Sequence, residues 1–384
     1  MRFSKKAAAC SLALCLVFTP VSVQCAEEAT MPFDVDARSA VLMDAETGSV
    51  LYEKNATEAL PPASVTKVMT LLLVMEAIDG GRLNLSDTVS ISEYAASMGG
   101  SQVYLEPGEQ MSVEDLLKSV VVSSANDAAV ALAETVAGSE EAFVSQMNAR
   151  AAELGMKSTV FENVTGLDDD TVHHLTSALD IALMSRELLT HESILNYTSI
   201  WMDTIRNGAF GLSNTNRLIR FYSGATGLKT GSTAKAGFCI SATARRDGFH
   251  LIAVIMGSPT RDTRNEMAKK LLDWGFANYT VYRNPASELG SVRVPGGVRE
   301  QCRVGYGAFT HLMKKGNERD VVYEIQLPDE IPAPIRCGDT VGRVIYRLGK
   351  ETIGESAVTA LEDVEKISFA GLLSRMLRFF LLHP

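Results

Sequence analysis

Segments that favour β-strands flank a long helical stretch, and this order constrains the fold more than any other feature of the sequence. Residues 39–55 alternate apolar and polar side chains around a Glu-Thr-Gly turn, which predicts a β-hairpin. Two further β-rich stretches, residues 227–245 and 249–257, come much later and are separated by Arg-Asp-Gly. We therefore expect an α/β domain whose antiparallel sheet combines strands from both ends of the domain.

Helical periodicity fills the segment between these strands. A helix is expected to begin at Ser64 and to end at Gly80-Gly81, because paired glycines stop helices. Further helices are predicted for residues 113–122, 125–137, 143–154 and 175–189, and one more, residues 265–275, follows the last strand.

The residue pattern changes near residue 286 from helical periodicity to short β-like runs, which predicts a second, smaller domain. Short β-like runs are interrupted there by proline and glycine, as at Pro295-Gly296-Gly297, and this is typical of a small all-β domain. Residues 367–382 then have helical period, are strongly apolar and cationic, and follow the last acidic residue, Glu365. Such a helix favours a membrane surface, with packing on its own protein as the alternative.

The N-terminus has the pattern of a signal peptide. Arg2, Lys5 and Lys6 precede an uncharged, mostly apolar run, residues 7–18, and small residues follow at Cys25 and Ala26. The run is short for a membrane span, so a permanent anchor is the less favoured alternative. We therefore expect the chain to be exported and to act on the outer side of the cytoplasmic membrane.

Charge and cysteine content exclude several classes of partner and cofactor. The formal net charge of −10 argues against nucleic acid, because phosphate binding needs clustered Lys and Arg. Cys302 and Cys337 could pair in an oxidising compartment, but with Cys239 they form a sparse, odd set, and unpaired thiols are favoured. The His173-His174 doublet has no partners at metal-ligand spacing, so neither a metal nor another cofactor is expected.

Ser64 and Lys67 are the first candidates for chemistry. They lie three residues apart at the expected start of a helix, so both side chains point to one face. A serine hydroxyl needs a base to become a nucleophile, and a lysine serves if burial or nearby cations lower its pKa. The alternative is a helix-capping serine followed by a solvated lysine.

Two further tripeptides strengthen this interpretation. Ser124-Ala125-Asn126 lies at the expected break between two helices and offers a hydroxyl for proton relay and an amide for a peptide backbone. Lys229-Thr230-Gly231 lies in an expected strand, where Gly admits a close backbone, Lys adds positive charge and Thr can bind a carboxylate. In the order S-x-x-K, S-x-N and K-T-G, the three form a specific set for nucleophilic serine chemistry.

With these motifs the chain resembles penicillin-binding proteins, and most closely the low-molecular-mass D-alanyl-D-alanine carboxypeptidases. The likeness spans roughly residues 30–280, and the small β domain and terminal helix stand where that family has them. Further matching residues are Met147-Asn148, Leu154-Gly155-Met156, Phe161, Asn163, Gly166-Leu167, Thr176, Asp180 and Asn214-Thr215-Asn216.

The resemblance implies roles for the matching positions. Ser64 would be the acylated nucleophile, Lys67 its general base, and Ser124 the relay to the leaving group, with Asn126 binding the peptide and Lys229 holding Ser124. The backbone N–H groups of Ser64 and Ser232 would form the oxyanion hole. The leaving carboxylate would be bound by Thr230, Thr233 and Arg264, although Arg264 could instead be a surface residue of a turn.

The implied function is a serine carboxypeptidase that removes the terminal D-Ala from peptidoglycan stem pentapeptides through an ester on Ser64. Penicillins and other β-lactams would acylate the same serine. A serine β-lactamase, a signal-anchored transpeptidase and an idle cell-wall-binding protein are the alternatives. The implied division is a signal peptide (1–26), a catalytic domain (27–280), a small β domain (281–362) and an amphipathic membrane-association helix (363–384).

Overall fold

The computed structural model describes residues 32–168 and 171–382, without the side chains of 379 and 382. The predicted signal peptide, residues 1–26, lies outside the described residues. The chain divides into two compact units, Met1–Asp34 and Val35–Pro384, and the second contains every helix and strand described below.

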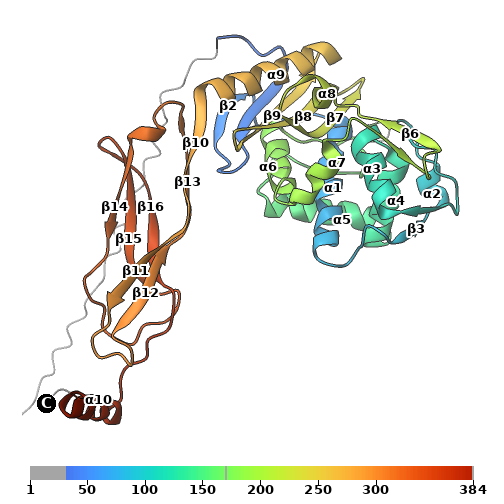
Figure 1. The fold of residues 1–384 in the computed structure, drawn as a ribbon. Coiled ribbons are helices and arrows are strands. Elements are labelled where there is room, and N and C mark those ends of the chain that lie inside the picture. Colours follow the sequence, from blue (N-terminus) through green and yellow to red (C-terminus); the bar gives the residue numbers. More distant parts are fainter. Residues whose placement is uncertain (1–31, 169–170, 383–384) are drawn as a thin grey trace, which may run out of the picture. The chain divides into compact units, whose positions relative to one another are not determined.

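A five-stranded antiparallel sheet forms the centre of the first part of the chain (Figure 1). The N-terminal hairpin joins the later strands through β1 and β9, with Ala40 opposite Ile255. All six residues of β1 are buried, as expected of a strand between two neighbours. The prediction of a sheet built from both ends of the domain is therefore confirmed. The strand order is β2 (Val50–Lys54), β1 (Ser39–Asp44), β9 (Phe249–Ser258), β8 (Gly237–Arg246) and β7 (Ala225–Thr233).

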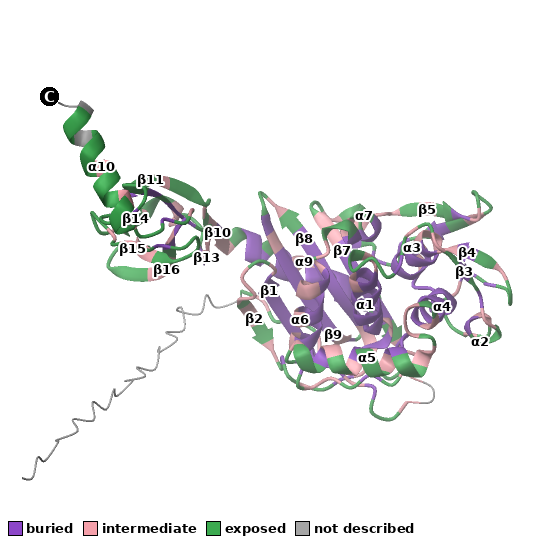
Figure 2. Cartoon of the chain, turned by 90° about the horizontal axis from the view of Figure 1, so that it is seen from below, coloured by how far each residue is buried: buried purple, intermediate pink, exposed green. Residues whose placement is uncertain are grey.

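Helices cover this sheet, with α9 (Arg261–Asn278) on one face and α1 (Lys67–Asp79) and α6 (Ala178–Leu188) on the other (Figure 1). Helix α1 is apolar all round and nearly every residue in it is buried, so it runs through the core rather than over its surface (Figure 2). The remaining elements are η1 (Ala63–Thr66), β3 (Thr88–Ser90), α2 (Glu93–Ala96), β4 (Gln110–Ser112), α3 (Val113–Ser123), α4 (Asn126–Ala137), α5 (Glu140–Glu153), η2 (Glu192–Ile194), α7 (Leu195–Thr198), β5 (Met202–Ile205), β6 (Phe210–Ser213) and α8 (Leu218–Phe221).

Capping residues explain where helix boundaries differ from the predictions. Helix α5 begins at Glu140 rather than 143 because the Ser139 side chain accepts a hydrogen bond from the N–H of Ala142. Thr260 caps α9 in the same way, so this helix begins at Arg261 rather than 265. Ser177 caps α6, and the two residues before it form isolated bridges instead of helix.

Two other predicted elements have a different form. The helix expected from Ser64 begins as the 3₁₀ turn η1 and becomes α-helical only at Lys67. The predicted run 227–245 is a hairpin of β7 and β8, because the chain turns between Thr233 and Gly237. Ser64 therefore lies in a 3₁₀ turn rather than in the α-helix, and Lys229 lies in the first strand of a hairpin.

The C-terminal part is all-β before its last helix, as predicted. Its sheet order is β11-β12-β16-β15-β14, and its small core includes Val304, Tyr346 and Val358. Cys302 is buried, Cys337 is exposed, and both are free thiols in this structure. The elements are β10 (Tyr279–Asn284), β11 (Ser287–Arg293), β12 (Gln301–Tyr306), β13 (Phe309–Lys314), η3 (Glu318–Asp320), β14 (Val321–Gln326), β15 (Thr340–Leu348), β16 (Glu351–Ala360) and α10 (Phe369–Leu382).

The terminal helix α10 shows its apolar side chains to solvent (Figure 2). Leu373, Met376 and Leu377 are each about half exposed, and Phe369 is almost fully exposed. Arg375 contacts the chain just before β12, where it donates to the carbonyl oxygen of Val298 and faces Glu300 at 3.5 Å. No helix within residues 32–168 and 171–382 combines the length and hydropathy of a membrane span.

Candidate active site

Ser64 lies in the tight turn η1, directly before the buried helix α1. Ala63 has a positive φ of 49°, which is uncommon for a residue with a Cβ and turns the chain sharply into η1. Ser64 is partly exposed, whereas Val65 and Thr66 are buried. The hydroxyl is therefore accessible on a backbone that the core holds in place. Ser64 does not cap the helix, so that alternative is wrong.

Lys67 is fully buried, and its ammonium group meets three oxygens. Nζ lies 3.0 Å from Ser64 Oγ, 2.6 Å from Asn126 Oδ1 and 2.8 Å from the carbonyl oxygen of Thr165. The last two oxygens only accept hydrogen bonds. A neutral amine at this position can give its two hydrogens to these oxygens and direct its lone pair at the Ser64 hydroxyl. The contacts are therefore compatible with a base at Lys67.

The electrostatic setting favours the neutral amine. Burial lowers the pKa of Lys67 well below its ordinary value of 10.5, and the positive charge of Lys229 lowers this pKa further. The buried carboxylate of Asp127 acts in the opposite direction and raises it. Asp127 itself accepts hydrogen bonds from the N–H groups of Val103 and Leu105, which fix the neighbouring loop.

Ser124 and Lys229 form a second hydroxyl–ammonium pair. Ser124 ends α3 in the left-handed conformation, with φ 62°, and Asn126 begins α4 two residues later. Lys229 Nζ donates to Ser124 Oγ at 2.8 Å and to the carbonyl oxygen of Thr230 at 2.9 Å. Burial lowers the pKa of Lys229 to about 7, and the charge of Arg264 contributes to this shift. The predicted break between the two helices is confirmed. It places the Ser124 hydroxyl within hydrogen-bond distance of Lys229 Nζ.

Strand β7 packs directly against the turn that holds Ser64. A Cβ added to Gly231 would lie 2.8 Å from the backbone nitrogen of Ser64 and 2.8 Å from the carbonyl oxygen of Pro62. Only glycine fits such a close approach. Lys229 and Gly231 are two residues apart in β7 and so lie on the same face of the strand.

Three hydroxyl side chains flank Gly231 at the end of β7. Thr230 Oγ1 donates to Thr215 Oγ1 at 2.8 Å, and the side chain of Ser232 is exposed. Thr233 Oγ1 donates to the Asp168 carboxylate at 2.5 Å. Thr215 and Asp168 were given no role from the sequence, although Asn214-Thr215-Asn216 belongs to the quoted resemblance.

Arg264 lies in the first turn of α9 and is only 3% exposed. Its guanidinium donates to Asn265 Oδ1, at 2.9 Å from Nη2, and to the carbonyl oxygen of Cys239, at 3.3 Å from Nη1. The alternative of a surface arginine is therefore wrong. Burial lowers the pKa of Arg264 to about 10, and its charge still acts on Lys229.

A loop before α6, residues 163–168, completes the surroundings of Lys67. The Asn163 side chain closes it, since Oδ1 accepts from the N–H of Gly166 at 2.7 Å and Nδ2 donates to the carbonyl oxygen of Leu167 at 2.8 Å. A Cβ on Gly166 would lie 1.9 Å from the carbonyl oxygen of Ala63. The loop therefore touches the turn before the nucleophile, and it supplies the Thr165 oxygen to Lys67.

His174 is hydrogen-bonded to η1, the turn that contains Ser64. Its Nδ1 accepts from the N–H of Glu162 at 3.0 Å, so Nε2 carries the proton of the neutral ring and donates to Thr66 Oγ1 at 2.7 Å. Burial lowers the pKa of His174 to about 4. The ring is therefore neutral near pH 7 and holds Thr66, the residue directly before Lys67.

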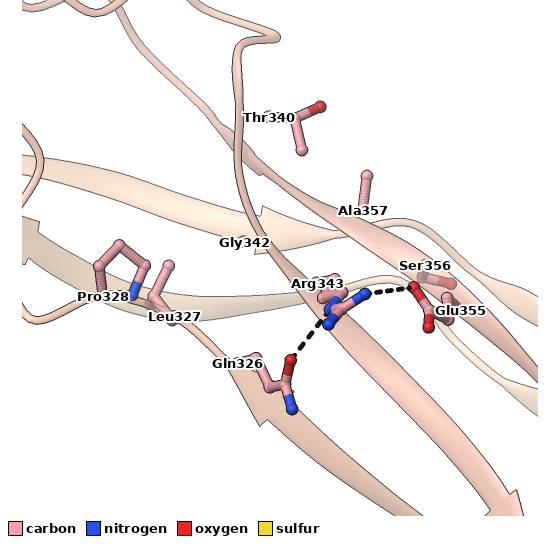
Figure 3. Close-up of a pocket in the computed structure, with 9 residues that line it drawn as sticks. All are labelled: Gln326, Leu327, Pro328, Thr340, Gly342, Arg343, Glu355, Ser356 and Ala357. Atoms are coloured by element: carbon pink, nitrogen blue, oxygen red, sulfur yellow. Dashed lines mark hydrogen bonds and ion pairs between the residues drawn. The ribbon is translucent and has the colours of Figure 1, made fainter. Parts of the chain in front are cut away.

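A separate hollow lies in the C-terminal sheet (Figure 3). It has a volume of about 710 Å³. Arg343 lines it, and its guanidinium donates to Gln326 Oε1 at 2.9 Å and pairs with the Glu355 carboxylate at 3.3 Å (Figure 3). Its lining contains Ser356 but no lysine, so it does not have the serine–lysine pairing found around Ser64.

Comparison with known families places both parts of the chain. A family model described as D-alanyl-D-alanine carboxypeptidase matches residues 24–260, which is more than half of the chain. A second model, the C-terminal domain of penicillin-binding protein 5, matches residues 287–366. The two matches cover the α/β part and the all-β part respectively.

Individual relatives extend this likeness over nearly the whole chain. The D-alanyl-D-alanine carboxypeptidase DacF of Bacillus subtilis is 44% identical over 349 residues, which are 88% of this chain and 89% of the relative. DacC of Escherichia coli is 33% identical over 94% of this chain and 92% of its own.

Solved structures agree with these relatives. Penicillin-binding protein 5 of Haemophilus influenzae has a TM-score of 0.76 at 31% identity, covering 88% of this chain and all of that one. Penicillin-binding protein D2 of Listeria monocytogenes, solved in an ampicillin-bound form, has a TM-score of 0.58 at 34% identity, covering 63% of this chain and 98% of its own.

Proposed function

The chain belongs to the D-alanyl-D-alanine carboxypeptidase family, and from that premise we propose how its residues carry out the reaction. It is a serine-type D-Ala-D-Ala carboxypeptidase of cell-wall metabolism and a penicillin-binding protein. The family fixes the reaction, whereas the roles below rest on the geometry around Ser64. The observation that carries them is the three-oxygen contact of a buried, pKa-lowered Lys67.

In the first step, Ser64 Oγ attacks the carbonyl carbon between two terminal D-alanines of a stem peptide. Neutral Lys67 takes the hydroxyl proton, because its lone pair faces Ser64 while its hydrogens are held by Asn126 and Thr165. The backbone N–H groups of Ser64 and Ser232 receive the developing oxyanion. The close approach of Gly231 to the Ser64 nitrogen supports this pairing.

In the second step, the terminal D-Ala leaves. Ser124 gives its proton to the leaving amine and takes up the proton that Lys67 received from Ser64, while protonated Lys229 orients Ser124 through the 2.8 Å contact. Asn126 binds the peptide backbone, and Thr230 and Thr233 bind the leaving carboxylate. Arg264 contributes positive charge from its buried position. Water then adds to the ester carbon, one of its protons returns to Ser64 Oγ, and the shortened peptide leaves as an acid.

Release of D-alanine from short peptides tests this function. A peptide that ends in D-Ala-D-Ala should lose one D-Ala per turnover, while the same peptide ending in D-Ala-L-Ala should be a poor substrate. The measurement is the terminal alanine released, D-Ala from the first peptide and L-Ala from the second, resolved by chiral chromatography, with Ser64→Ala as the inactive control. Equal release from both peptides, or release by Ser64→Ala, would contradict the proposal.

The alternatives lack support among the described residues. A fast β-lactamase needs a second base for the ester, but the Glu162 carboxylate accepts from the N–H groups of Val172 and His173, and the described partners of Lys67 include no carboxylate. An idle binding protein has no need of two buried lysines, which are costly to bury. We expect β-lactams to acylate Ser64 and to leave slowly.

The two lysines predict a bell-shaped pH profile for acylation by penicillin. The second-order rate should rise with pH as Lys67 loses its proton, and fall above about pH 7 as Lys229 loses the proton that orients Ser124. On this basis Lys229→Arg should remove the alkaline limb, because arginine stays charged. Circular dichroism across the pH range serves as the folding control. If the alkaline limb persists unchanged in Lys229→Arg, a group other than Lys229 causes the fall in rate at high pH.

Peptidoglycan, the substrate of this family reaction, lies outside the cytoplasm, and the proposed division of the chain suits that location. We assign residues 1–26 as a signal peptide, 27–280 as the catalytic domain, 281–362 as the β domain and 363–384 as a membrane-association helix. The exposed apolar side chains of α10 and its arginines support the last assignment. The helix would hold the enzyme at the outer face of the cytoplasmic membrane.

Vesicle binding tests the helix. The double variant Leu373→Glu/Leu377→Glu should bind anionic lipid vesicles at least tenfold more weakly than wild type, because each leucine contributes about 1.5 kcal/mol or more when buried. Its kcat/KM on a soluble peptide should be unchanged. Cosedimentation is the measurement, and Lys157→Ala, a residue of the catalytic domain, is the control. Equal vesicle binding by wild type and the double variant would contradict the assignment.

A further inference from the structure

The Thr233 hydroxyl is already bound to a carboxylate in the free protein. Its Oγ1 donates to Asp168 Oδ2 at 2.5 Å and accepts from the N–H of Ala236 at 3.0 Å. The neighbouring Lys235 Nζ donates to the main-chain oxygen of Asp168. Two contacts therefore tie the end of the 163–168 loop to the turn between β7 and β8.

This arrangement bears on substrate binding because a hydroxyl has only one proton to donate. Under the proposed function, Thr233 donates that proton to the terminal carboxylate of the substrate. Asp168 now holds it with the same chemical group. Two carboxylates at this hydroxyl would also repel each other.

We propose that Asp168 competes with the terminal carboxylate: it occupies Thr233 in the free enzyme, and the substrate carboxylate binds by displacing it. The inference rests on the proposed role of Thr233. Its consequence is a binding penalty that only ligands with a carboxylate at this position meet. A ligand with a correctly placed carboxylate regains the Thr233 hydrogen bond, whereas a ligand without one leaves Thr233 with Asp168 and gains nothing there.

A purely structural role for the same contact makes a different prediction. If Asp168 only ties the loop to the turn, removing its charge loosens the loop beside Lys67 and slows acylation by every ligand alike. If Asp168 competes for Thr233, removing its charge helps only ligands that carry a carboxylate. A pair of ligands that differ in the carboxylate alone separates the two roles.

The experiment compares benzylpenicillin with its methyl ester on the full-length protein. In Asp168→Asn, the second-order acylation rate should rise about three- to tenfold for benzylpenicillin, the worth of one hydrogen bond of this kind. The rate for the ester should stay within about twofold. For a peptide ending in D-Ala-D-Ala, KM should fall with kcat unchanged. Asp168→Ala should show the same discrimination.

Lys235→Met is the matched control, since it removes the other tie of the loop and leaves the carboxylate in place. It should change the rates of both ligands equally or not at all. The proposal is overturned if Asp168→Asn changes both ligands by the same factor, or changes neither. A wild-type protein that neither ligand labels would instead refute the proposed function, so the two failures are distinct.

Discussion

Lys67→Met should slow acylation by penicillin about a thousandfold, because general-base catalysis contributes roughly 10²–10⁴ in rate. Methionine has similar length and no charge, so the fold should survive the change. The Asn126 and Thr165 oxygens lose their donor, which costs about 1–3 kcal/mol for each unsatisfied buried group. Part of this loss is offset because no amine remains to be buried. Stopped-flow acylation and urea unfolding measure the two effects separately.

Lys118→Met is the control for that variant. Lys118 lies on α3, outside the site, and forms weak ion pairs with Glu114 and Asp203. Its loss should change the acylation rate by less than about twofold, because exposed ion pairs contribute little. If Lys67→Met acylates within tenfold of wild type, the base that activates Ser64 is another group.

Gly166→Ala should damage both the fold and the site. The new Cβ would lie 1.9 Å from the carbonyl oxygen of Ala63 and 2.4 Å from its carbonyl carbon, so either the loop or the turn before Ser64 has to move. A shift of about 1 Å can reduce a catalytic rate by 10²-fold. Overpacking adds about 1–3 kcal/mol of destabilisation to the left-handed φ penalty of about 1 kcal/mol.

Gly155→Ala separates these two contributions. Gly155 has φ +72°, close to the +79° of Gly166, but no atom lies within 4 Å of its added Cβ. It should lose only about 1 kcal/mol of unfolding free energy and keep its acylation rate. Thermal unfolding and labelling by a fluorescent penicillin compare the two variants. Equal behaviour would mean that contact with Ala63 is unimportant.

Much of the fold follows from local patterns in the sequence. The hairpin at residues 39–55, the helix break at Ser124 and the final all-β part were each marked by turn residues or periodicity, and the structure has all of them. The pairing of β1 with β9 followed because strands at both ends of one domain need a common sheet. The residues of the three motifs meet as the resemblance implied.

Other parts of the site depend on backbone atoms and close approaches, which side-chain patterns do not encode. The Thr165 contact with Lys67 uses a carbonyl oxygen that every residue possesses. Gly166 was part of the resemblance, but its contact with Ala63 needs the three-dimensional structure. The burial of Arg264 follows from Thr260 starting α9 earlier than periodicity suggests. The Asp168–Thr233 contact joins positions 65 residues apart and has no local signal.

Peptide mapping by mass spectrometry after incubation with penicillin tests the central claim most directly. Folding must bring a hydroxyl from η1 and amines from α1 and β7 to one reacting carbonyl. We predict a single covalent adduct on the peptide containing Ser64 in the wild-type protein, and none in Ser64→Ala. An adduct of equal yield in Ser64→Ala, or one mapped to Ser124, would contradict the account.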